Sequence, residues 1–369
     1  MPGSAAPGHC RTFLSADPVA MSAERRRTKR SPRFTEIALE AGVSPSTVDR
    51  VLNERGSVSE SLRRRVVEAA KRLGTNRLLP DVRHGVLHFD VVLVHSEVAH
   101  FRRINNALER YSGLIGPRVT VHRSAWGERD DERLAQFLEQ PPYPRHGLLI
   151  VARDSERIRQ ALHVVNAAGT PVVTLSSDIT GVQRLAYVGI DNTLAGRTAG
   201  YLAGRFTRSA GKVWIAVSSM EFRAHIERVE GFTQIVTEQF PHLDPLPPVE
   251  MFDDVERAYA QLHDALRHHH DIVAIYNTGS ASAGIRRALR RHPLATSPVW
   301  IGHEATREHA DLLRAGDMAA TLDQDPEGQV LSGLQHLLHA NEELEQAPEG
   351  RTRFRLITPE NLGQFELFA

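Results

Sequence analysis

Short runs of apolar, β-branched residues alternate with helical patterns over most of this chain, from Phe89 to about residue 340. The first run, FDVVLVH at 89–95, is apolar almost throughout, as expected of a parallel strand buried on both faces. Repeated strand–helix units build doubly wound parallel sheets with helices on both faces. The roughly 280 residues from Phe89 to the end of the chain exceed what one lobe needs, so this pattern predicts an α/β fold with two lobes. The other strands are expected at 147–152, 170–176, 186–191, 212–218, 271–277, 298–303 and 318–324.

The segment from Phe34 to Leu73 has a different pattern, which predicts three short helices. Gly42 should end the first helix, because glycine adopts the left-handed conformation of a helix end at least cost. Ser44 is a favourable N-cap for the second helix, and Pro45 suits its first position. The buried stripes are expected at Ile37, Ala38, Ala41, Val48, Val51 and Leu52. This is a helix-turn-helix pattern, whose second helix can enter the DNA major groove.

The net charge of zero hides an uneven distribution. Residues 24–77 carry 14 Lys and Arg against 7 Asp and Glu, so the rest of the chain is mildly acidic. A basic end on an acidic body is the charge layout of a DNA-binding head joined to a sensor. The basic cluster at 25–30 could reach phosphates as well, or it could be a solvated tail.

Four regions follow from these patterns. Residues 1–30 lack periodicity and predict a disordered basic extension, in which Met21 could be the true start. The helix-turn-helix head is expected at 31–75, followed by a linker at 76–88, where Pro80 prevents one continuous helix. The sensor is expected at 89–369, with an N-lobe of 89–191 plus about 325–350 and a C-lobe of 192–324.

Composition and motif spacing argue against several classes of protein. No apolar run reaches the ~18 residues of a membrane span, no signal peptide is apparent and Cys10 is alone, so we expect a cytoplasmic protein without a membrane partner. The three adjacent histidines at 268–270 would point in different directions from a helix, so no metal site is expected. His303-Glu304 lacks the second His of a zinc protease motif, and no Gly-rich phosphate loop or nucleophile elbow follows a strand. We therefore expect no cofactor and no enzymatic activity.

Ligands of open α/β sheets bind beyond the carboxyl ends of the strands. Carboxylates, amides and arginine bind hydroxyl groups, and an aromatic ring can cover the C–H surface of a ligand. The residues that follow the expected strands have this mixture: 95–101, 176–178, 191–192, 218–228, 277–280, 303–304 and 323–324. The sequence therefore predicts a site for a hydroxyl-rich small molecule, with Asp178 included from its place after a strand.

Several motifs resemble those of the LacI/GalR family of bacterial transcription regulators. AGVSPSTVDRVLN (41–53), followed by VSESLRRRVVEAAKRLG (58–74), is similar to the family's head in order and spacing. Five downstream segments resemble the type I periplasmic sugar-binding fold that these regulators use as a sensor: VGIDNTLAGRTAGYL (188–202), ERVEGF (227–232), AIYNTG (274–279), WIGHE (300–304) and AATLDQDP (319–326). The resemblance covers about residues 33–345.

The resemblance implies roles for residues of the head. The family's base-contacting positions fall on Pro45, Ser46 and Arg50, and the guanidinium fork of Arg50 matches the acceptors of guanine. The family's phosphate-contacting positions are Thr35, Ser44, Thr47 and Asn53.

Two features depart from the family pattern. Asp49 stands where the family usually has Ser, and near phosphates it needs a partner such as Arg50, Arg33 or a cytosine amine. Leu78 or Leu79 could enter the minor groove or could simply pack in the linker, because the Pro80 nearby argues against the family's hinge helix.

In the sensor, the fold's sugar-binding positions fall on Phe101, Arg228, Asn277, Glu304 and Gln324. Ser177, Asp178 and His225 are further candidates. Each polar residue could instead make a structural hydrogen bond, and Phe101 could belong to the core. Glu304 replaces the family's Asp and is longer by one methylene, so we expect a different arrangement of ligand hydroxyls.

The resemblance implies a DNA-binding transcription regulator, expected to be a repressor, that acts as a homodimer on double-stranded operator DNA. A sugar, sugar acid or cyclitol would bind between the two lobes as effector and would either release or promote DNA binding. The alternative is a solute-binding protein for a sugar transporter, against which the helix-turn-helix argues.

Overall fold

The structure is a computed structural model that describes residues 32–53, 55, 58–75, 86–94, 97–116, 118–127, 129–348 and 352–365. The chain divides into two compact units, residues 1–85 and 86–369. The expected basic extension at 1–30 and both Leu78 and Leu79 lie outside the described residues. No helix in the described ranges is both long and apolar enough to cross a membrane.

The described residues of the first unit form the helices α1 (Phe34–Ala41), α2 (Pro45–Leu52) and α3 (Glu60–Arg72). Helix α1 ends at Gly42, whose φ of 61° is left-handed, as the sequence predicts. Ser44 caps α2 by accepting a hydrogen bond from the backbone N–H of Thr47 at 3.2 Å. Arg65 of α3 donates to the backbone oxygens of Ala41 and Gly42, which fixes the turn before α2. The expected apolar stripes form the core of this unit.

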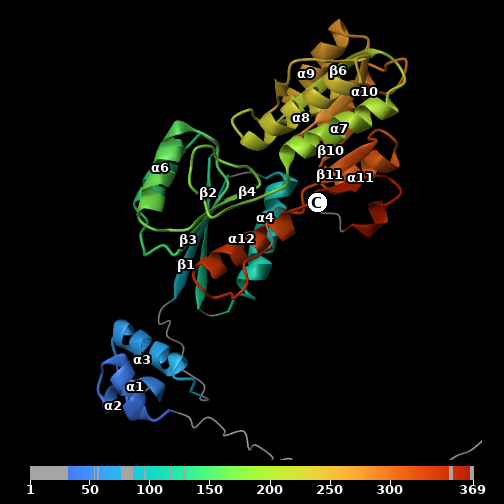
Figure 1. Cartoon of the computed structure of the whole chain (residues 1–369). Helices are drawn as coiled ribbons and strands as arrows, with labels where there is room; N and C mark the ends of the chain where they lie inside the picture. Colours follow the sequence, from blue (N-terminus) through green and yellow to red (C-terminus); the bar gives the residue numbers. More distant parts are fainter. Residues whose placement is uncertain are drawn as a thin grey trace, which may run out of the picture. The chain divides into compact units, whose positions relative to one another are not determined.

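The second unit begins with a sheet of five parallel strands in the order β2-β1-β3-β4-β5. Helices α5 (Asp131–Glu139) and α6 (Glu156–Ala167) cover one face, and α4 (Ala99–Ser112) and α12 (Pro326–Ala340) cover the other. Figure 1 shows α6 on one side of this sheet and α4 and α12 on the other. This is the N-lobe. Its strands are β1 (Leu87–Val94), β2 (Val119–Trp126), β3 (Gly147–Ile150), β4 (Val172–Leu175) and β5 (Ala186–Val188).

The C-lobe is built on a second sheet, in the order β12-β11-β10-β9-β6-β7, with β8 also paired to β6. Helices α7 (Asn192–Phe206) and α8 (Arg223–Gln239) cover one face. The other face packs against α9 (Val255–His268), α10 (Ser282–Arg291), α11 (Arg307–Arg314) and the short helix η1 (Leu362–Gln364). The strands are β6 (Gly211–Val217), β7 (Leu243–Pro245), β8 (Val249–Glu250), β9 (Ile272–Asn277), β10 (Val299–His303), β11 (Ala320–Asp323) and β12 (Arg355–Ile357).

The chain passes between the lobes three times. It enters the C-lobe after β5, returns with α12 to the N-lobe, and comes back to the C-lobe with β12. Strand β12 pairs antiparallel with β11, so residues 355–357, which the sequence did not assign to a lobe, belong to the second sheet. These crossings place the carboxyl ends of the strands of both sheets around the space between the lobes.

Candidate functional site

The head presents the start of α2 to solvent. Pro45, Ser46 and Arg50 are exposed, and so is Thr35 on α1. The hydroxyl of Ser44 lies 2.8 Å from the hydroxyls of both Ser46 and Thr47, so the residues at this helix end hold one another in place. The predicted base-contacting residues are therefore all accessible to solvent on a short, capped helix.

Asp49 has a partner other than the arginines or the cytosine amine expected from the sequence. The side-chain amide of Asn53, one turn further along α2, donates to the Asp49 carboxylate at 2.6 Å. This bond satisfies an oxygen of Asp49 without a cation, and it fixes the amide of Asn53, one of the predicted phosphate contacts.

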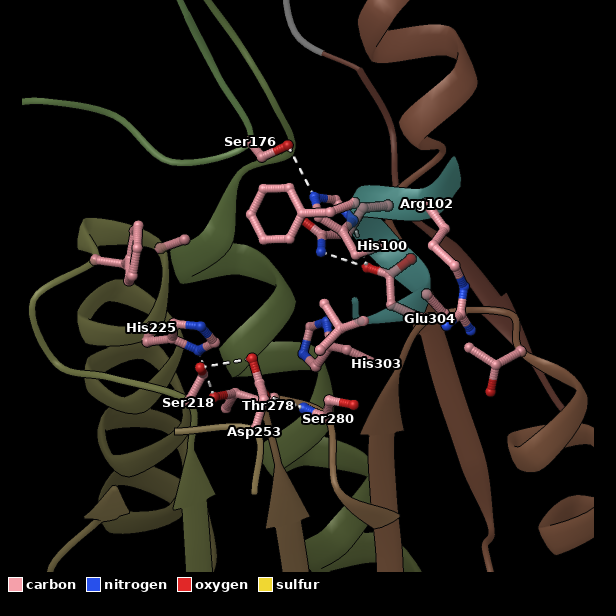
Figure 2. A pocket seen from close by; sticks show the side chains of 18 of the residues that line it. His100, Arg102, Ser176, Ser218, His225, Asp253, Thr278, Ser280, His303 and Glu304 are labelled. Atoms are coloured by element: carbon pink, nitrogen blue, oxygen red, sulfur yellow. Dashed lines mark hydrogen bonds and ion pairs between the residues drawn. The ribbon is translucent and has the colours of Figure 1, made fainter. Parts of the chain in front are cut away.

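A cavity of about 550 Å³ lies between the N-lobe and the C-lobe, a size typical of small-molecule sites (Figure 2). It is lined by residues that follow β4, β6, β9, β10 and β11, and by the first turns of α4 and α8. Six of the predicted residues line it: Phe101, Ser177, His225, Arg228, Glu304 and Gln324.

Arg228 lies deep in this cavity, with 3% of its surface exposed. Its guanidinium donates to the side-chain oxygens of Asn192 at 2.8 Å and Gln324 at 2.7 Å, and to the backbone oxygen of Thr278 at 3.1 Å. Burial lowers the pKa of Arg228, although not far enough to remove its charge near neutral pH. The three bonds fix the guanidinium as a donor at the inner wall of the cavity.

Glu304 brings an ionised carboxylate into the same cavity from the end of β10. Its Oε1 lies 3.2 Å from Nδ1 of His100, and Arg103 donates to its Oε2 at 3.1 Å. Burial alone would raise the pKa of Glu304, but His100, Arg103 and Gln324 together hold it well below its usual range. Figure 2 shows His100 between Glu304 and Ser176, whose hydroxyl lies 3.0 Å from Nε2 of His100.

A second polar group lines the C-lobe side of the cavity, where Figure 2 shows Ser218, His225, Asp253 and Thr278 close together. The Ser218 hydroxyl donates to Asp253 at 2.8 Å, and the backbone N–H of Ser280 donates to the other carboxylate oxygen at 2.7 Å. Nδ1 of His225 lies 2.7 Å from the Thr278 hydroxyl. Burial, together with the charge of Arg228, lowers the pKa of His225 to about 3, so this ring is neutral near pH 7.

Apolar side chains complete the wall. Phe101 lines the cavity and also packs against the core of the N-lobe, with its ring edge-on to His100 at 5.4 Å between centroids. Phe222, Phe252 and Val151 line other parts. The cavity thus combines aromatic surface with hydroxyl, amide, guanidinium and carboxylate groups.

Two of the predicted ligand residues do not line this cavity. Asp178 accepts a hydrogen bond from Thr174 at 2.8 Å and pairs with Arg184, so its carboxylate is engaged within the N-lobe. Asn277 is fully buried, and its amide donates to the backbone oxygen of Ser280 and to the hydroxyl of Ser282 at the start of α10. The structure therefore corrects their predicted placement, because local bonds hold both side chains away from the cavity.

Sequence reasoning missed His100 and Asp253. His100 falls within the expected strand-end segment 95–101, but no helix was predicted from 99, so its side chain had no assigned direction. Asp253 follows the two-residue strand β8, and both Phe252 and Asp253 have left-handed φ angles, 52° and 55°. Nothing in the sequence pattern indicates this turn. Within the described ranges, no group of three or more His, Cys, Asp or Glu side chains could hold a metal ion.

Two family models match the chain. Residues 34–75 match bacterial regulatory proteins of the lacI family, and residues 93–340 match the periplasmic binding protein domain. The two matches fall on the two compact units of the structure.

Curated relatives match about half of the chain. The ribose import binding protein RbsB of Salmonella typhimurium is 28% identical over 181 residues, which are 49% of this chain and 60% of that protein. The HTH-type transcriptional regulator GntR of Pseudomonas aeruginosa is 29% identical over 187 residues, or 49% of this chain and 52% of that protein. The matched segments thus span between half and three fifths of these relatives.

Solved structures share the fold of the sensor. A solute binding protein of an ABC transporter from Bacillus halodurans, with bound myo-inositol, has a TM-score of 0.67 at 20% identity and covers 76% of this chain and 98% of its own. One from Agrobacterium vitis, with bound D-fucose, has a TM-score of 0.68 at 19% identity and covers 74% and 96%. These structures show the fold of the larger unit. The two family matches show that the chain belongs to the lacI family of bacterial regulatory proteins, with a periplasmic binding protein domain as its larger unit.

Proposed function

We propose that this protein is a transcription regulator, acting as a repressor, whose affinity for operator DNA is set by a sugar-type effector in the cavity between the lobes. The observation that carries the proposal is the union of two features in one chain. One is a helix-turn-helix with Arg50 exposed at its second helix, and the other is an interlobe cavity lined by Arg228, Glu304 and Phe101.

The chemistry of the cavity supports a polyhydroxylated effector. Arg228 supplies donors, Glu304 and Asp253 supply acceptors, and aromatic rings can cover the C–H face of a sugar, sugar acid or cyclitol. RbsB is a ribose import binding protein, and the two solute binding proteins hold myo-inositol and D-fucose, which agrees with this class. We propose as contacts Phe101, Ser177, His225, Arg228, Glu304 and Gln324, together with His100 and Asp253.

The effector would act by favouring one arrangement of the two lobes over another. In a homodimer, that choice would alter how two heads reach the two halves of an operator in the cytoplasm. The alternative, a solute-binding protein for a sugar transporter, fits the sensor but leaves the head without a role.

A thermal-shift screen of the full chain against D-ribose, D-galactose, D-fucose, D-gluconate and myo-inositol tests the sensor. A compound at ~100 times its dissociation constant adds ~2.7 kcal/mol to the free energy of unfolding, which raises the melting temperature by several degrees. Selection of bound duplexes from a random library tests the head, and we expect a two-fold symmetric motif. Failure to enrich any sequence would count against the regulator.

A further inference from the structure

Arg103 occupies an unusual position between the lobes. It belongs to α4 of the N-lobe, it has 3% of its surface exposed, and it contacts the carboxylates of Glu304, Asp323 and Glu327. Arg103 itself does not line the cavity, but Glu304 does. Arg103 therefore acts on the cavity indirectly, and Glu304 is its contact that lines the cavity.

The three carboxylates come from both sides of the interlobe space. Glu327 lies in the first turn of α12, which packs on the N-lobe sheet, and it accepts two hydrogen bonds from Arg103, at 2.8 and 2.7 Å. Asp323 is the last residue of β11 and Glu304 directly follows β10, both in the C-lobe, and Nη1 of Arg103 donates to both carboxylates. One guanidinium fork thus joins a helix of the N-lobe to two strands of the C-lobe.

Asp323 links this contact to the backbone turns around it. Its carboxylate accepts hydrogen bonds from the backbone N–H groups of Ala305 at 2.9 Å and Asp325 at 3.0 Å. Ala305 directly follows Glu304, and Asp325 lies at the crossover into α12. A displacement at Arg103 would therefore reach both the residue that faces the cavity and the segment that connects the lobes.

The backbone at Glu304 needs such support. Its φ of 80° is left-handed, a conformation that costs energy in a residue with a side chain, and it directs the carboxylate toward α4. His100, three residues before Arg103, contacts the same carboxylate from the same helix. His100 and Arg103, on one face of α4, thus both contact the Glu304 carboxylate.

We propose that Arg103 is a positioning residue of the effector site, which aims the Glu304 carboxylate into the cavity and clamps the two lobes against each other. The inference rests on the proposed function only in assigning the cavity to an effector. A buried ion pair of this kind adds little to the free energy of unfolding, because the charges lose their hydration. Its main effect is to specify one arrangement of the groups that it joins. Without Arg103, Glu304 and Asp323 become neighbouring like charges, which repel each other.

Interlobe distances measured by pulsed electron paramagnetic resonance test the clamp without DNA or effector. Spin labels go on the exposed positions His163→Cys of α6 and Gln261→Cys of α9, in a full chain that carries Cys10→Ser. We expect one narrow distance distribution in this background and a broader, longer one after Arg103→Met. Arg103→Lys should give an intermediate result, because a single ammonium cannot span carboxylates from both lobes. An unchanged distribution in folded Arg103→Met would overturn the clamp.

Arg145→Met is the matched control. The side chain of Arg145 is as buried as that of Arg103, and it bonds Asp90 at 2.5 Å, but Arg145 and Asp90 both belong to the N-lobe. This variant should lower stability and leave the interlobe distance unchanged, so broadening after Arg145→Met would mean that loss of any buried pair suffices. If Arg103→Met does not fold, Arg103→Lys replaces it in the test. An interlobe distance distribution for Arg103→Lys that is identical to that of the background would then refute the proposal.

The carboxyl ¹³C resonance of Glu304, identified through Glu304→Gln, gives a second readout. Loss of Arg103 should move the titration midpoint of this carboxyl upward by about 1 pH unit, since a cation within contact distance lowers a carboxyl pKa by that order. An unmoved midpoint would show that Arg103 does not act on Glu304. Because neither readout contains DNA or effector, these results are independent of whether the protein proves to be a regulator.

Discussion

At the residue scale, the cavity consists of buried polar side chains that already bond to one another. Arg228 is held by Asn192 and Gln324, and the Gln324 amide in turn donates to Glu304. Side chains fixed in this way lose little freedom when an effector binds, so more of the interaction energy appears as affinity. Single substitutions in this network should therefore have large effects on effector binding.

Arg228→Ala tests the network most simply. Loss of a charged donor to an effector hydroxyl costs ~1.5–3 kcal/mol, or ~10–200-fold in affinity. Isothermal titration with whichever compound raises the melting temperature in the screen measures this change. DNA affinity without the compound should stay within twofold of wild type, because the head is a separate unit. An unaltered dissociation constant for the compound would remove Arg228 from the site.

Arg50→Ala addresses the head. If Arg50 reads a base, its loss should cost ~1–3 kcal/mol on the selected duplex and relax the preference at one base pair. Arg64→Ala removes an equal charge from an exposed position of α3 and is the control. We expect the control to weaken binding to all duplexes evenly, as measured by fluorescence anisotropy. If Arg50→Ala and Arg64→Ala lost the same affinity for both specific and non-specific DNA, Arg50 would be assigned to phosphate binding.

Buried histidines predict a pH dependence of stability. Burial lowers the pKa values of His225, His303 and His309 in the folded protein, so these rings stay neutral where the unfolded chain binds protons. The free energy of unfolding should therefore fall as pH decreases below ~6.5, by up to ~1.4 kcal/mol per pH unit for each histidine. Urea titrations at pH 7, 6 and 5 measure the slope.

His225→Gln should reduce the pH dependence of the free energy of unfolding by up to ~1.4 kcal/mol per pH unit, the contribution of one proton. The glutamine amide does not titrate and can still bond Thr278. His270→Gln, at an exposed position, is the control and should leave the slope as in wild type. Parallel curves for His225→Gln and wild type would mean that folding does not lower the pKa of His225.

At the element scale, the contact between α7 and α8 sets the position of Arg228. A Cβ at Gly231 would lie 2.1 Å from the backbone oxygen of Thr193, and one at Gly196 would lie 2.0 Å from the backbone oxygen of Arg228. The two helices therefore touch through backbone atoms, which cannot move aside as a flexible side chain can. This close approach carries Arg228 against the inner wall of the cavity.

Gly231→Ala should separate the two helices. Overpacking of this kind costs ~1–3 kcal/mol, more than the ~1 kcal/mol that alanine gains over glycine in a helix. We expect a melting temperature several degrees lower and weaker effector binding. Gly113→Ala at the end of α4 is the control, since its nearest neighbour would be 3.7 Å away. A wild-type melting temperature for Gly231→Ala would show that the helices can shift at no cost.

The sequence predicted the elements that are buried on both sides. β1, β6, β9 and β10 are nearly continuous apolar runs, and each lies within two residues of its expected bounds. It did not predict β2, whose residues alternate between half-buried and exposed at the sheet edge, or the two-residue strand β8. Short and half-exposed elements leave little hydrophobic pattern, because the sheet around them determines their conformation.

The same limit explains what was missed at the site. The polar residues after long strands, such as Glu304 and Gln324, were found because their strands were found. Helix α4 was not predicted, and so the roles of His100 and Arg103 were not apparent, although both contact Glu304. Asp178 and Asn277 were placed at the correct strand ends, but local hydrogen bonds turn their side chains away from the cavity.

At the scale of the whole molecule, a head that matches the lacI family and a sensor that matches periplasmic binding proteins share one chain. In the account proposed above, the two functions are coupled, because the effector binds one lobe arrangement more tightly than another. Thermodynamic linkage then requires that DNA change effector affinity by the same factor as effector changes DNA affinity.

A homodimer should place two heads on one duplex. Sedimentation of the protein with the selected duplex measures the stoichiometry, and we expect two chains per duplex. Truncating the duplex to one half-site should reduce affinity by orders of magnitude, because the two heads no longer bind together. Tight binding of one chain to a half-site would contradict the dimer.

Coupling between head and sensor is tested by the affinity for the selected duplex, measured by fluorescence anisotropy with and without a saturating amount of the stabilising compound. We predict a change of ~5–150-fold, the usual range of coupling between two sites, and its loss in Arg228→Ala. An equal affinity with and without a compound that demonstrably occupies the cavity would show that head and sensor are uncoupled, and would contradict the account.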